Sequence, residues 1–522
     1  MKATNLRLVS LSFLYLVLTY AQAQDGGQVT VTAERVQSAV TELERLAQNE
    51  IQTGAVPGLA IAVVFQDEVV FAKGFGVRDT KTNEPVNAGT VFQLASVSKP
   101  VGSTVIASLV GEGIISWDSH IADLDPSFAM YDPWVTREVT LRDMYSHRSG
   151  LPFEAGEELE NLGFSRKQIL HRLRYQRPDS SFRSSYAYTN YGLTAAAVAA
   201  AKAEGKTWAE LSAERLYQPL GMDSTSSRFA DFMARPNKAL GHVLREGEWV
   251  HERQREPDAQ SPAGGASSSV SDMAKWLRLH LGSGRFGDSQ IIPEEALAET
   301  YQLQILRDFS SSGLPEFYGL GWNVRYDAQG LLRLDHSGAF RLGAGTTVNL
   351  VPAEGLGIVV LTNSSPTGVA EGLAATFIDL ALYGEPKQAW LEIFKGAFGQ
   401  MMLAGNLSAA YATPPASPTP ALSNDAYLGT YSNNFFGDMA VVERDGGLAI
   451  VQGPKEMTFP MTHFDRDTFT YVTQGETAVG TAGIFFHLGA DDHATSVTVE
   501  NLDIDGQGTF TRVNGEAADI AQ

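Results

Sequence analysis

The sequence predicts an α/β fold in which an antiparallel sheet is flanked by helices and carries a helical insertion, followed by a small antiparallel β-barrel. Two observations predict the first unit. Strand-like runs lie at both of its ends, at 58–79 and 319–363, and the stretch between them at 117–303 is mostly helical. A third observation predicts the barrel: a proline-rich stretch at 404–424 precedes a series of short alternating runs at 425–522.

The N-terminal end has the pattern of a secretory signal peptide. Lys2 and Arg7 precede an apolar run at 8–20, and Ala21-Gln22-Ala23 follows as a small-residue cleavage site. We therefore expect residues 1–23 to be removed and the mature protein to be periplasmic or secreted, with an uncleaved anchor as the alternative. No later stretch is long and apolar enough to cross a bilayer, so we expect no stable membrane span in the mature chain.

Composition and short motifs exclude several function classes. The formal net charge of -21 disfavours nucleic acid or an anionic membrane as the main partner. The chain has no cysteine, which removes thiol nucleophiles and thiolate zinc sites. Its ten histidines form no H-E-x-x-H pair, and the sequence has no Walker A loop. We therefore expect no metal and no cofactor.

The unit at 24–403 begins with a helix and a hairpin. Apolar residues at helical spacing predict an amphipathic helix over 31–52, and two β-rich runs predict an antiparallel hairpin over 58–79. The next helix is expected at 96–113, with Pro100 near its start, where the missing N–H costs least. A further helix is expected at about 368–382, after the second group of strands.

The proline-rich stretch at 404–424 has the composition of a linker, since it contains four prolines between Pro414 and Pro420. Beyond it, two alternating runs surround Asp445-Gly446-Gly447, which is typical of a hairpin. Further strand-like runs follow, so residues 425–522 are expected to form the barrel.

Three short motifs follow one another along the first unit. They are S-x-x-K at Ser96 and Lys99, Y-x-N in Tyr188-Thr189-Asn190, and His336-Ser337-Gly338 on a strand-like segment. A lone S-x-x-K is expected by chance, but the order and company of the three resemble the signature of the penicillin-recognising serine hydrolases. The resemblance is closest to the branch of class C β-lactamases, serine esterases and related peptidases, and implies a β-lactamase-like fold.

The sequence around the motifs also resembles this family. The segments "VTLRDMYSHRSGLP" and "HSGAFRLGAGTTVNLVPAEGLGIVVLTN" match in kind, as does the stretch after Y-x-N that ends in "PLGM". The similarity extends over about 57–382, which makes coincidence a poor explanation.

The chemistry of Ser96 depends on a neighbouring base, because a serine hydroxyl is a weak nucleophile until its proton is taken. Lys99 stands one helical turn after Ser96, so the two side chains share a face of the helix. The helix N-terminus and desolvation both disfavour a charged ammonium, which makes Lys99 one candidate base. Tyr188 is the second, since a phenol near cations can titrate below its usual value.

The resemblance also implies roles for the remaining motif residues. Tyr188 would take or relay the Ser96 proton, and Asn190 would offer its amide to the substrate. The backbone N–H groups of Ser96 and Ala339 would form the oxyanion hole.

The third motif completes these implied roles. Gly338 would let the strand approach Ser96 closely, and Ser337 and Gly338 would line the substrate site. His336 stands where class C β-lactamases usually have lysine and is counted with the catalytic residues. That departure favours peptidase or esterase relatives over a true β-lactamase.

Three further features need an alternative interpretation. Tyr431-Ser432-Asn433 is a second Y-x-N, which we interpret as a surface turn of the barrel because it follows the linker. His147 could form a rival triad with Ser149 or Asp143, although no G-x-S-x-G supports it. Arg341 could bind a substrate carboxylate or be a structural charge.

The sequence thus predicts an exported serine hydrolase that works through an acyl-enzyme. We expect a small-molecule or short-peptide substrate: short or unusual peptides, including D-residue peptides or linearised cyclic peptides such as microcystin products. The alternatives are a carboxylesterase for short acyl esters and a β-lactam-binding protein with weak turnover. The barrel resembles the lipocalin-like extension of some related peptidases, which can gate the active site or support homo-oligomers; a simple docking domain is the alternative.

Overall fold

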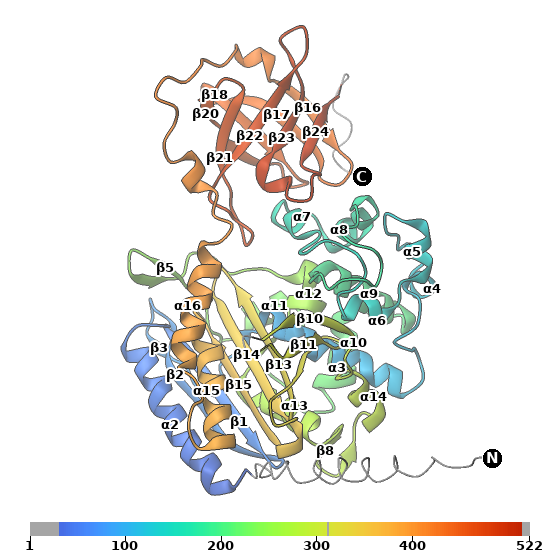
Figure 1. Ribbon diagram of the computed structural model, residues 1–522, viewed down its shortest axis with the longest axis vertical. Coiled ribbons are helices and arrows are strands. Elements are labelled where there is room, and N and C mark those ends of the chain that lie inside the picture. Colours follow the sequence, from blue (N-terminus) through green and yellow to red (C-terminus); the bar gives the residue numbers. More distant parts are fainter. Residues whose placement is uncertain (1–30, 311–312, 514–522) are drawn as a thin grey trace, which may run out of the picture.

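The computed structural model describes residues 31–310 and 313–513; the predicted signal peptide at 1–23 lies outside them. Two nine-stranded sheets dominate the fold, one in the body of the molecule and one in the C-terminal unit above it (Figure 1). Within the described ranges, every helix is too short or too polar to cross a membrane.

The sheet of the body is antiparallel, and strands from the two ends of the unit meet at its centre. Leu59 pairs with Thr362, so the first hairpin continues a sheet whose other strands come much later in the sequence. In spatial order the strands are β10 (Ile305–Phe309), β11 (Pro315–Tyr318), β12 (Asn323–Tyr326), β13 (Leu332–Phe340), β14 (Ala344–Val351), β15 (Leu356–Thr362), β1 (Gly58–Phe65), β2 (Glu68–Asp79) and β3 (Glu84–Pro85).

The outer face of this sheet is covered by α2 (Ala33–Gln52) and α15 (Val369–Tyr383), with α16 (Trp390–Leu403) packed on α15 (Figure 1). All eight residues of β1 are buried because both faces of the strand are covered. The predicted hairpin is present, and Gln66 and Asp67 form its tight turn with positive φ.

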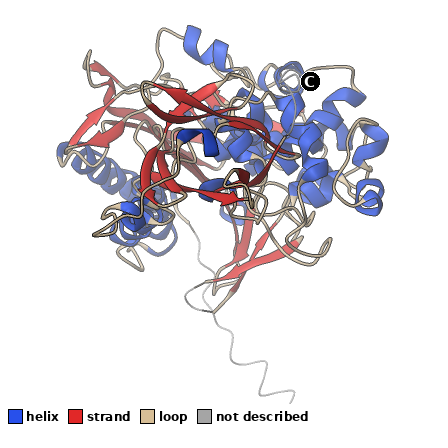
Figure 2. Cartoon of the chain, turned by 90° about the horizontal axis from the view of Figure 1, so that it is seen from above, coloured by secondary structure: helices blue, strands red, loops and turns tan. Residues whose placement is uncertain are grey.

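On the inner side α13 (Val270–Leu281) packs on β1 and β15, and α3 (Ser98–Gly111) and α9 (Asn190–Ala203) pack on each other in the same layer. Helices therefore lie on both sides of the sheet (Figure 2). The predicted helical insertion forms most of this layer. Its shorter helices are α4 (Ile121–Leu124), α5 (Pro133–Glu138), α6 (Leu141–Tyr145), α7 (Glu157–Asn161), α8 (Arg166–Arg172), α10 (Trp208–Ser212), α11 (Phe229–Ala234), α12 (Ser261–Gly264) and α14 (Glu294–Glu299). Short strand pairs interrupt it: β4 (Phe92–Gln93) with β7 (Ser267–Ser268), β5 (Val243–Arg245) with β6 (Glu248–Val250), and β8 (Arg285–Phe286) with β9 (Ser289–Gln290).

The C-terminal sheet curls into a nearly closed antiparallel barrel, in agreement with the predicted fold class. Asp445 and Gly446 have positive φ and make the tight turn that the sequence predicts. The strands lie in the order β19 (Met457–Pro460), β18 (Gly447–Gln452), β17 (Gly437–Arg444), β16 (Gly429–Asn433), β24 (Thr509–Arg512), β23 (Ala494–Val499), β22 (Thr481–Leu488), β21 (Thr468–Val472) and β20 (Thr462–Asp465).

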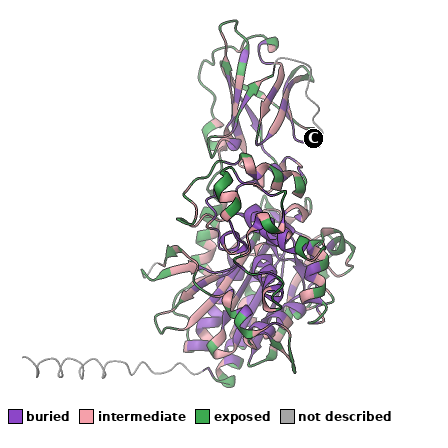
Figure 3. Ribbon diagram, turned by 90° about the vertical axis from the view of Figure 1, so that its right-hand side faces the viewer, coloured by how far each residue is buried: buried purple, intermediate pink, exposed green. Residues whose placement is uncertain are grey.

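The barrel and the body share one hydrophobic cluster. Leu159, Leu162 and Phe164, from α7 and the loop after it, are buried in the same cluster as Ile450 and Phe459 of the barrel. Figure 3 shows the barrel at one end of the body. The barrel is therefore packed against the body and not only tethered to it.

Two sequence expectations need correction. Tyr431-Ser432-Asn433 is not a surface turn: it lies in β16, and the Tyr431 ring is fully buried, where its hydroxyl donates to the Tyr427 carbonyl. The structure also contains a helix, α16, directly before the expected linker, and the sequence analysis did not predict this helix.

Candidate active site

Ser96 lies in a short 3₁₀ turn, Ala95–Val97, that leads directly into α3. The residue before it, Ala95, has φ +46 and is completely buried. A left-handed conformation costs a non-glycine residue about 1–3 kcal/mol, and such strain is concentrated at functional sites. This turn directs the Ser96 hydroxyl toward the helices of the inner layer.

Lys99 lies in the first turn of α3, and its side chain is fully buried. Its Nζ is 3.0 Å from Ser96 Oγ, 2.5 Å from Asn190 Oδ1 and 3.0 Å from the Ala263 carbonyl oxygen. Two of these partners can only accept a hydrogen bond, whereas the serine hydroxyl can also donate. A neutral amine therefore satisfies all three contacts and keeps its lone pair for the Ser96 proton.

Tyr188 comes from the extended segment just before α9, and its hydroxyl donates a 2.8 Å hydrogen bond to Ser96 Oγ. The Lys99 ammonium position is 4.4 Å from the centre of the Tyr188 ring. The structure thus brings the serine, the lysine and the tyrosine of the first two motifs together around one oxygen atom.

Burial moves the pKa values of the two candidate bases in opposite senses. It lowers the pKa of Lys99 to about 7, although the carboxylates of Glu157 and Glu154 act the other way. It raises the pKa of Tyr188 well above its usual range, and the hydrogen bond to Ser96 compensates only in part. This direction is opposite to the expectation that Tyr188 titrates below its usual value, because desolvation is the largest influence on its pKa.

Asn190 bridges Lys99 to a carboxylate that the sequence analysis missed. Its Oδ1 accepts from Lys99, and its Nδ2 donates a 2.5 Å hydrogen bond to Glu157 Oε1. Burial, reinforced by Glu154, raises the pKa of Glu157 to about 8. These two bonds use one N–H and one lone pair of the amide, so its second N–H stays available for the predicted contact with substrate. Glu157 belongs to no sequence motif. It is the first residue of α7, and only the folding of the chain brings its carboxyl group close to Asn190 and Lys99.

The third motif lies on β13 beside the Ser96 turn. A Cβ atom on Gly338 would be 2.4 Å from the Leu94 carbonyl oxygen and 2.8 Å from the Ser96 nitrogen. Only glycine permits this approach. It places the strand that carries Ala339 directly against the backbone N–H of Ser96, the arrangement that the predicted oxyanion hole requires.

His336 is near the site but has no hydrogen bond to the nucleophile. Its Nε2 lies 2.9 Å from the Tyr318 hydroxyl, and its Nδ1 is 2.7 Å from the Ser337 carbonyl. The ring centres of His336 and Tyr188 are 6.4 Å apart. Burial, helped by Lys99, lowers the pKa of His336 to about 3, so the ring is neutral where related enzymes have a lysine.

The Ser337 side chain does not line the site. In the register of the sheet it is paired with Thr347, and its hydroxyl points to Thr347 Oγ1 and to Glu371 of α15. Because side chains alternate along a strand, a residue between His336 and Gly338 must face the opposite layer. The expectation that Ser337 contacts substrate can hold only for its main chain.

The rival triad is not assembled. His147 Nδ1 accepts from the Thr189 N–H, and its buried Nε2 has no partner. Asp143 is bound instead by Arg148 and Arg183. His147 packs its ring against Tyr188, with ring centres 4.6 Å apart, and so supports the tyrosine.

A second carboxylate missed by the sequence analysis comes from the barrel. Glu476, in the connection between β21 and β22, accepts hydrogen bonds from the N–H groups of Arg341 (2.5 Å) and Leu342 (3.4 Å), just after β13. It also lies 3.5 Å from the guanidinium of Arg255. The barrel therefore contacts the strand end that carries the predicted oxyanion donor, and the half-buried Arg341 is held by its main chain.

The described residues contain no group of three or more His, Asp or Glu side chains placed to hold a metal ion.

Comparison with known proteins gives two family matches. Residues 43–383 match the Beta-lactamase family, and residues 413–515 match a domain of unknown function, DUF3471. The second match begins inside the predicted linker and covers the barrel.

Relatives with descriptive names cover most of the chain. "Unguisins hydrolase ungD" of Aspergillus violaceofuscus is 25% identical over 82% of both chains. "Penicillin-binding protein 4" of Amycolatopsis lactamdurans is 27% identical over 75% of this chain and 94% of its own.

A solved structure has the same fold. The octameric penicillin-binding protein homologue from Pyrococcus abyssi superposes with a TM-score of 0.60 and 21% identity, over 88% of this chain and 98% of its own. Together with the three motifs in one site and the family match across 43–383, these findings show that the chain belongs to the Beta-lactamase family of serine hydrolases, which act on amide or ester bonds.

Proposed function

We propose that this protein is an exported serine hydrolase that cleaves amide bonds in short or unusual peptides through an acyl-enzyme on Ser96. The observation that carries the proposal is the convergence of Lys99 Nζ and Tyr188 Oη on Ser96 Oγ, at 3.0 and 2.8 Å. The N-terminal signal pattern supports export.

In the acylation step, Ser96 Oγ forms a bond to the substrate carbonyl carbon, and its proton passes to the neutral amine of Lys99. A pKa near 7 supports this choice of base, because about half of the Lys99 side chains are then unprotonated at neutral pH. Tyr188, whose raised pKa keeps its proton on the phenol, donates to Ser96 Oγ and relays the lysine proton to the departing amine. The C–N bond breaks, and the acyl group remains on Ser96.

Deacylation is the reverse sequence with water as the nucleophile. The unprotonated Lys99, through Tyr188, accepts a proton from the attacking water, and the water oxygen bonds to the acyl carbon. The ester bond to Ser96 then breaks, the proton returns from Lys99 to Ser96 Oγ, and a carboxylic acid is released. Backbone N–H groups of Ser96 and Ala339 would stabilise the oxyanion in both steps.

The preference for peptides over β-lactams rests on His336. With its pKa lowered to about 3, this side chain offers no positive charge to a substrate carboxylate. Burial raises the pKa values of Glu154 and Glu157 beside Lys99, so these side chains add no positive charge for an anionic group either. A neutral acyl segment fits these surroundings better. The unguisins hydrolase relative is consistent with a substrate other than a β-lactam.

The test begins with intact-mass spectrometry of the purified mature protein after treatment with a fluorophosphonate. We expect one adduct on the wild type and none on Ser96→Ala. Ser149→Ala, which removes the rival hydroxyl, is the matched control and should retain the adduct. An adduct that survives Ser96→Ala, or its absence from the wild type, would refute the mechanism.

A substrate panel then separates the activities. Peptide amides, including D-residue peptides, are compared with short acyl esters and a chromogenic β-lactam by their kcat/KM values. The proposal expects the highest value for an amide. A preference for esters would identify a carboxylesterase, and a stable β-lactam adduct without turnover would identify a β-lactam-binding protein.

A further inference from the structure

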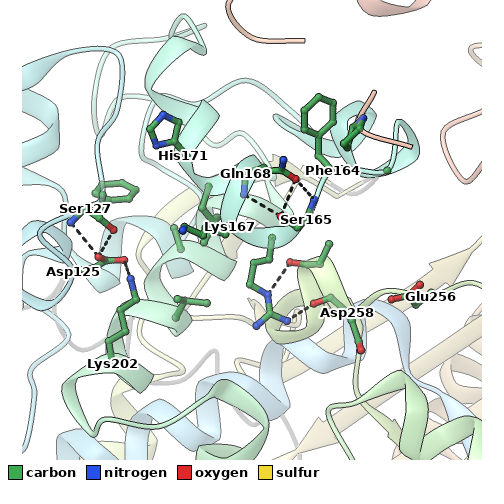
Figure 4. Close-up of a pocket in the computed structure, with 18 of the residues that line it drawn as sticks. Asp125, Ser127, Phe164, Ser165, Lys167, Gln168, His171, Lys202, Glu256 and Asp258 are labelled. Carbon is green, nitrogen blue, oxygen red and sulfur yellow. Dashed lines mark hydrogen bonds and ion pairs between the residues drawn. The ribbon is translucent and has the colours of Figure 1, made fainter. Parts of the chain in front are cut away.

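A cavity of about 800 Å³ lies outside the active site, between the body and the barrel (Figure 4). Its walls come from α8, α9 and the turn between β18 and β19, and none of the motif residues lines it. This volume is within the range of small-molecule sites, which occur preferentially at domain interfaces.

The cavity has an apolar side. Phe128, Phe164 and Ala195 are buried residues that line it, and Leu170 and Val198 add half-buried aliphatic surface. These side chains can remove an aliphatic or aromatic group of a ligand from water, at about 25 cal/mol for each Å² of apolar surface buried.

Several charged groups of the cavity are already satisfied by the protein. Lys202 forms an ion pair with Asp125 at 2.5 Å, as Figure 4 shows. The guanidinium of Arg166 donates to the carbonyl oxygens of Asp258 and Ala259. Lys202 and Asp125 neutralise each other, and the carboxylate of Asp258 balances the charge of Arg166, so these groups add little net charge.

Two cations remain. Lys167 of α8 and Lys455 of the barrel turn line the cavity, and neither ammonium has a hydrogen-bond or ion-pair partner among the residues that the structure describes. The aliphatic stem of Lys455 lies on Gly163, where a Cβ atom would be 2.9 Å from it. One lysine therefore comes from each unit. The exposed Glu256 also lines the cavity, so the two lysines leave a net positive charge in a chain whose overall charge is -21.

We propose that this cavity binds an amphiphilic carboxylate, with its apolar body on Phe128, Phe164 and Val198 and its carboxylate at Lys167 and Lys455. A bound acid of this kind contacts both units, so it stabilises their packing by mass action. The site is separate from the acyl-enzyme chemistry and does not depend on it.

The test uses 8-anilinonaphthalene-1-sulfonate, an aromatic anion whose fluorescence rises in apolar surroundings, titrated into the full mature protein. We expect one saturable site. Dodecanoate should displace the probe, whereas dodecyltrimethylammonium, with the same chain length and the opposite charge, should displace it at least tenfold less well.

Two variants locate the site. The double variant Lys167→Glu, Lys455→Glu reverses the unpaired charges, and Val198→Trp fills the apolar side; each should weaken probe binding at least tenfold. Lys81→Glu and Val69→Trp, which change exposed residues on and after β2, are the matched controls and should bind within twofold of the wild type. Fluorophosphonate labelling of Ser96 verifies that each variant is folded.

Three outcomes would overturn the proposal: no saturable binding by the wild type, equal displacement by the cationic amphiphile, or binding that neither cavity variant weakens. If Val198→Trp fails to fold, the charge-reversal variant decides alone, because both of its positions are exposed lysines.

Discussion

Lys99 is a buried amine whose hydrogen-bond partners are all uncharged: the Ser96 hydroxyl, the Asn190 amide and the Ala263 carbonyl. A group in such surroundings retains its proton less readily than one in water, which is why its pKa falls to about 7. Its protonation state therefore changes within the range of pH in which enzymes are usually assayed.

The first prediction is that kcat/KM rises with pH, with a midpoint near 7. Below that value Lys99 is an ammonium and cannot accept the Ser96 proton; above it the free amine can. The measurement is kcat/KM for the best substrate between pH 5 and 9. A profile that still rises at pH 9 without a midpoint would instead indicate a base of higher pKa, such as the tyrosine, and a flat profile would exclude both.

Glu157 leads to a second prediction at this scale. With a pKa of about 8 its carboxyl is mostly neutral at pH 7, so Glu157→Gln should keep kcat/KM within about threefold. Glu157→Ala removes the acceptor of the Asn190 amide, and the loss of about 1.4 kcal/mol of positioning should lower kcat/KM about tenfold.

The comparison of the two variants is the decisive result, because a merely structural role would affect both through stability. Glu68→Ala, at an exposed position in β2, serves as the control. If the glutamine variant lost as much activity as the alanine variant, the negative charge of Glu157, and not its hydrogen bond, would be the essential property.

At the scale of elements, the close packing of β13 against the Ser96 turn determines the site. Gly338→Ala places a Cβ atom 2.4 Å from the Leu94 carbonyl oxygen and must push strand and turn apart. We expect kcat/KM to fall at least about a hundredfold, as for the loss of an oxyanion donor, with a lower melting temperature. Gly396→Ala in α16, where a Cβ atom meets nothing within 4 Å, is the control and should be neutral or stabilising.

The connection between β21 and β22 gives a further prediction. Glu476→Ala removes the acceptor of the Arg341 and Leu342 N–H groups and frees the end of β13. At about 1 kcal/mol for each of the two hydrogen bonds, kcat should fall about thirtyfold. Glu456→Ala, an exposed residue in another barrel turn, should have no effect. Equal activity of the two variants would mean that the barrel contact is irrelevant to catalysis.

Much of this element-level arrangement was predictable, and the exceptions have physical reasons. The hairpin of β1 and β2, the helix after Ser96 and the barrel turn at Asp445 follow from periodicity and turn chemistry. Strand alternation also predicts the outward direction of the Ser337 side chain, because the neighbouring His336 and Gly338 face the site. Glu157 and Glu476 had no local signal, because tertiary packing alone brings their loops to the site.

At the scale of the whole molecule, the shared hydrophobic cluster makes the barrel part of the folded core. Phe164 and Leu162 of the body are buried together with Phe459 of the barrel. We therefore predict a single cooperative transition in calorimetry, and Phe164→Ala should shift that transition to lower temperature as one peak. Leu403→Ala, at an exposed position in α16, should leave it in place. Two separate peaks in the wild type would show that the units unfold independently.

The central pairing of the sheet has a consequence for biosynthesis. β1 cannot find its neighbour β15 until Thr362 has left the ribosome, although Leu59 emerged long before. During that interval β1 is an apolar strand, buried on both faces in the finished protein, with an unpaired edge. Such a strand is prone to aggregation and folds late because its contacts are distant in sequence. The body sheet can therefore be completed only late in synthesis, and this timing suits the export that we propose.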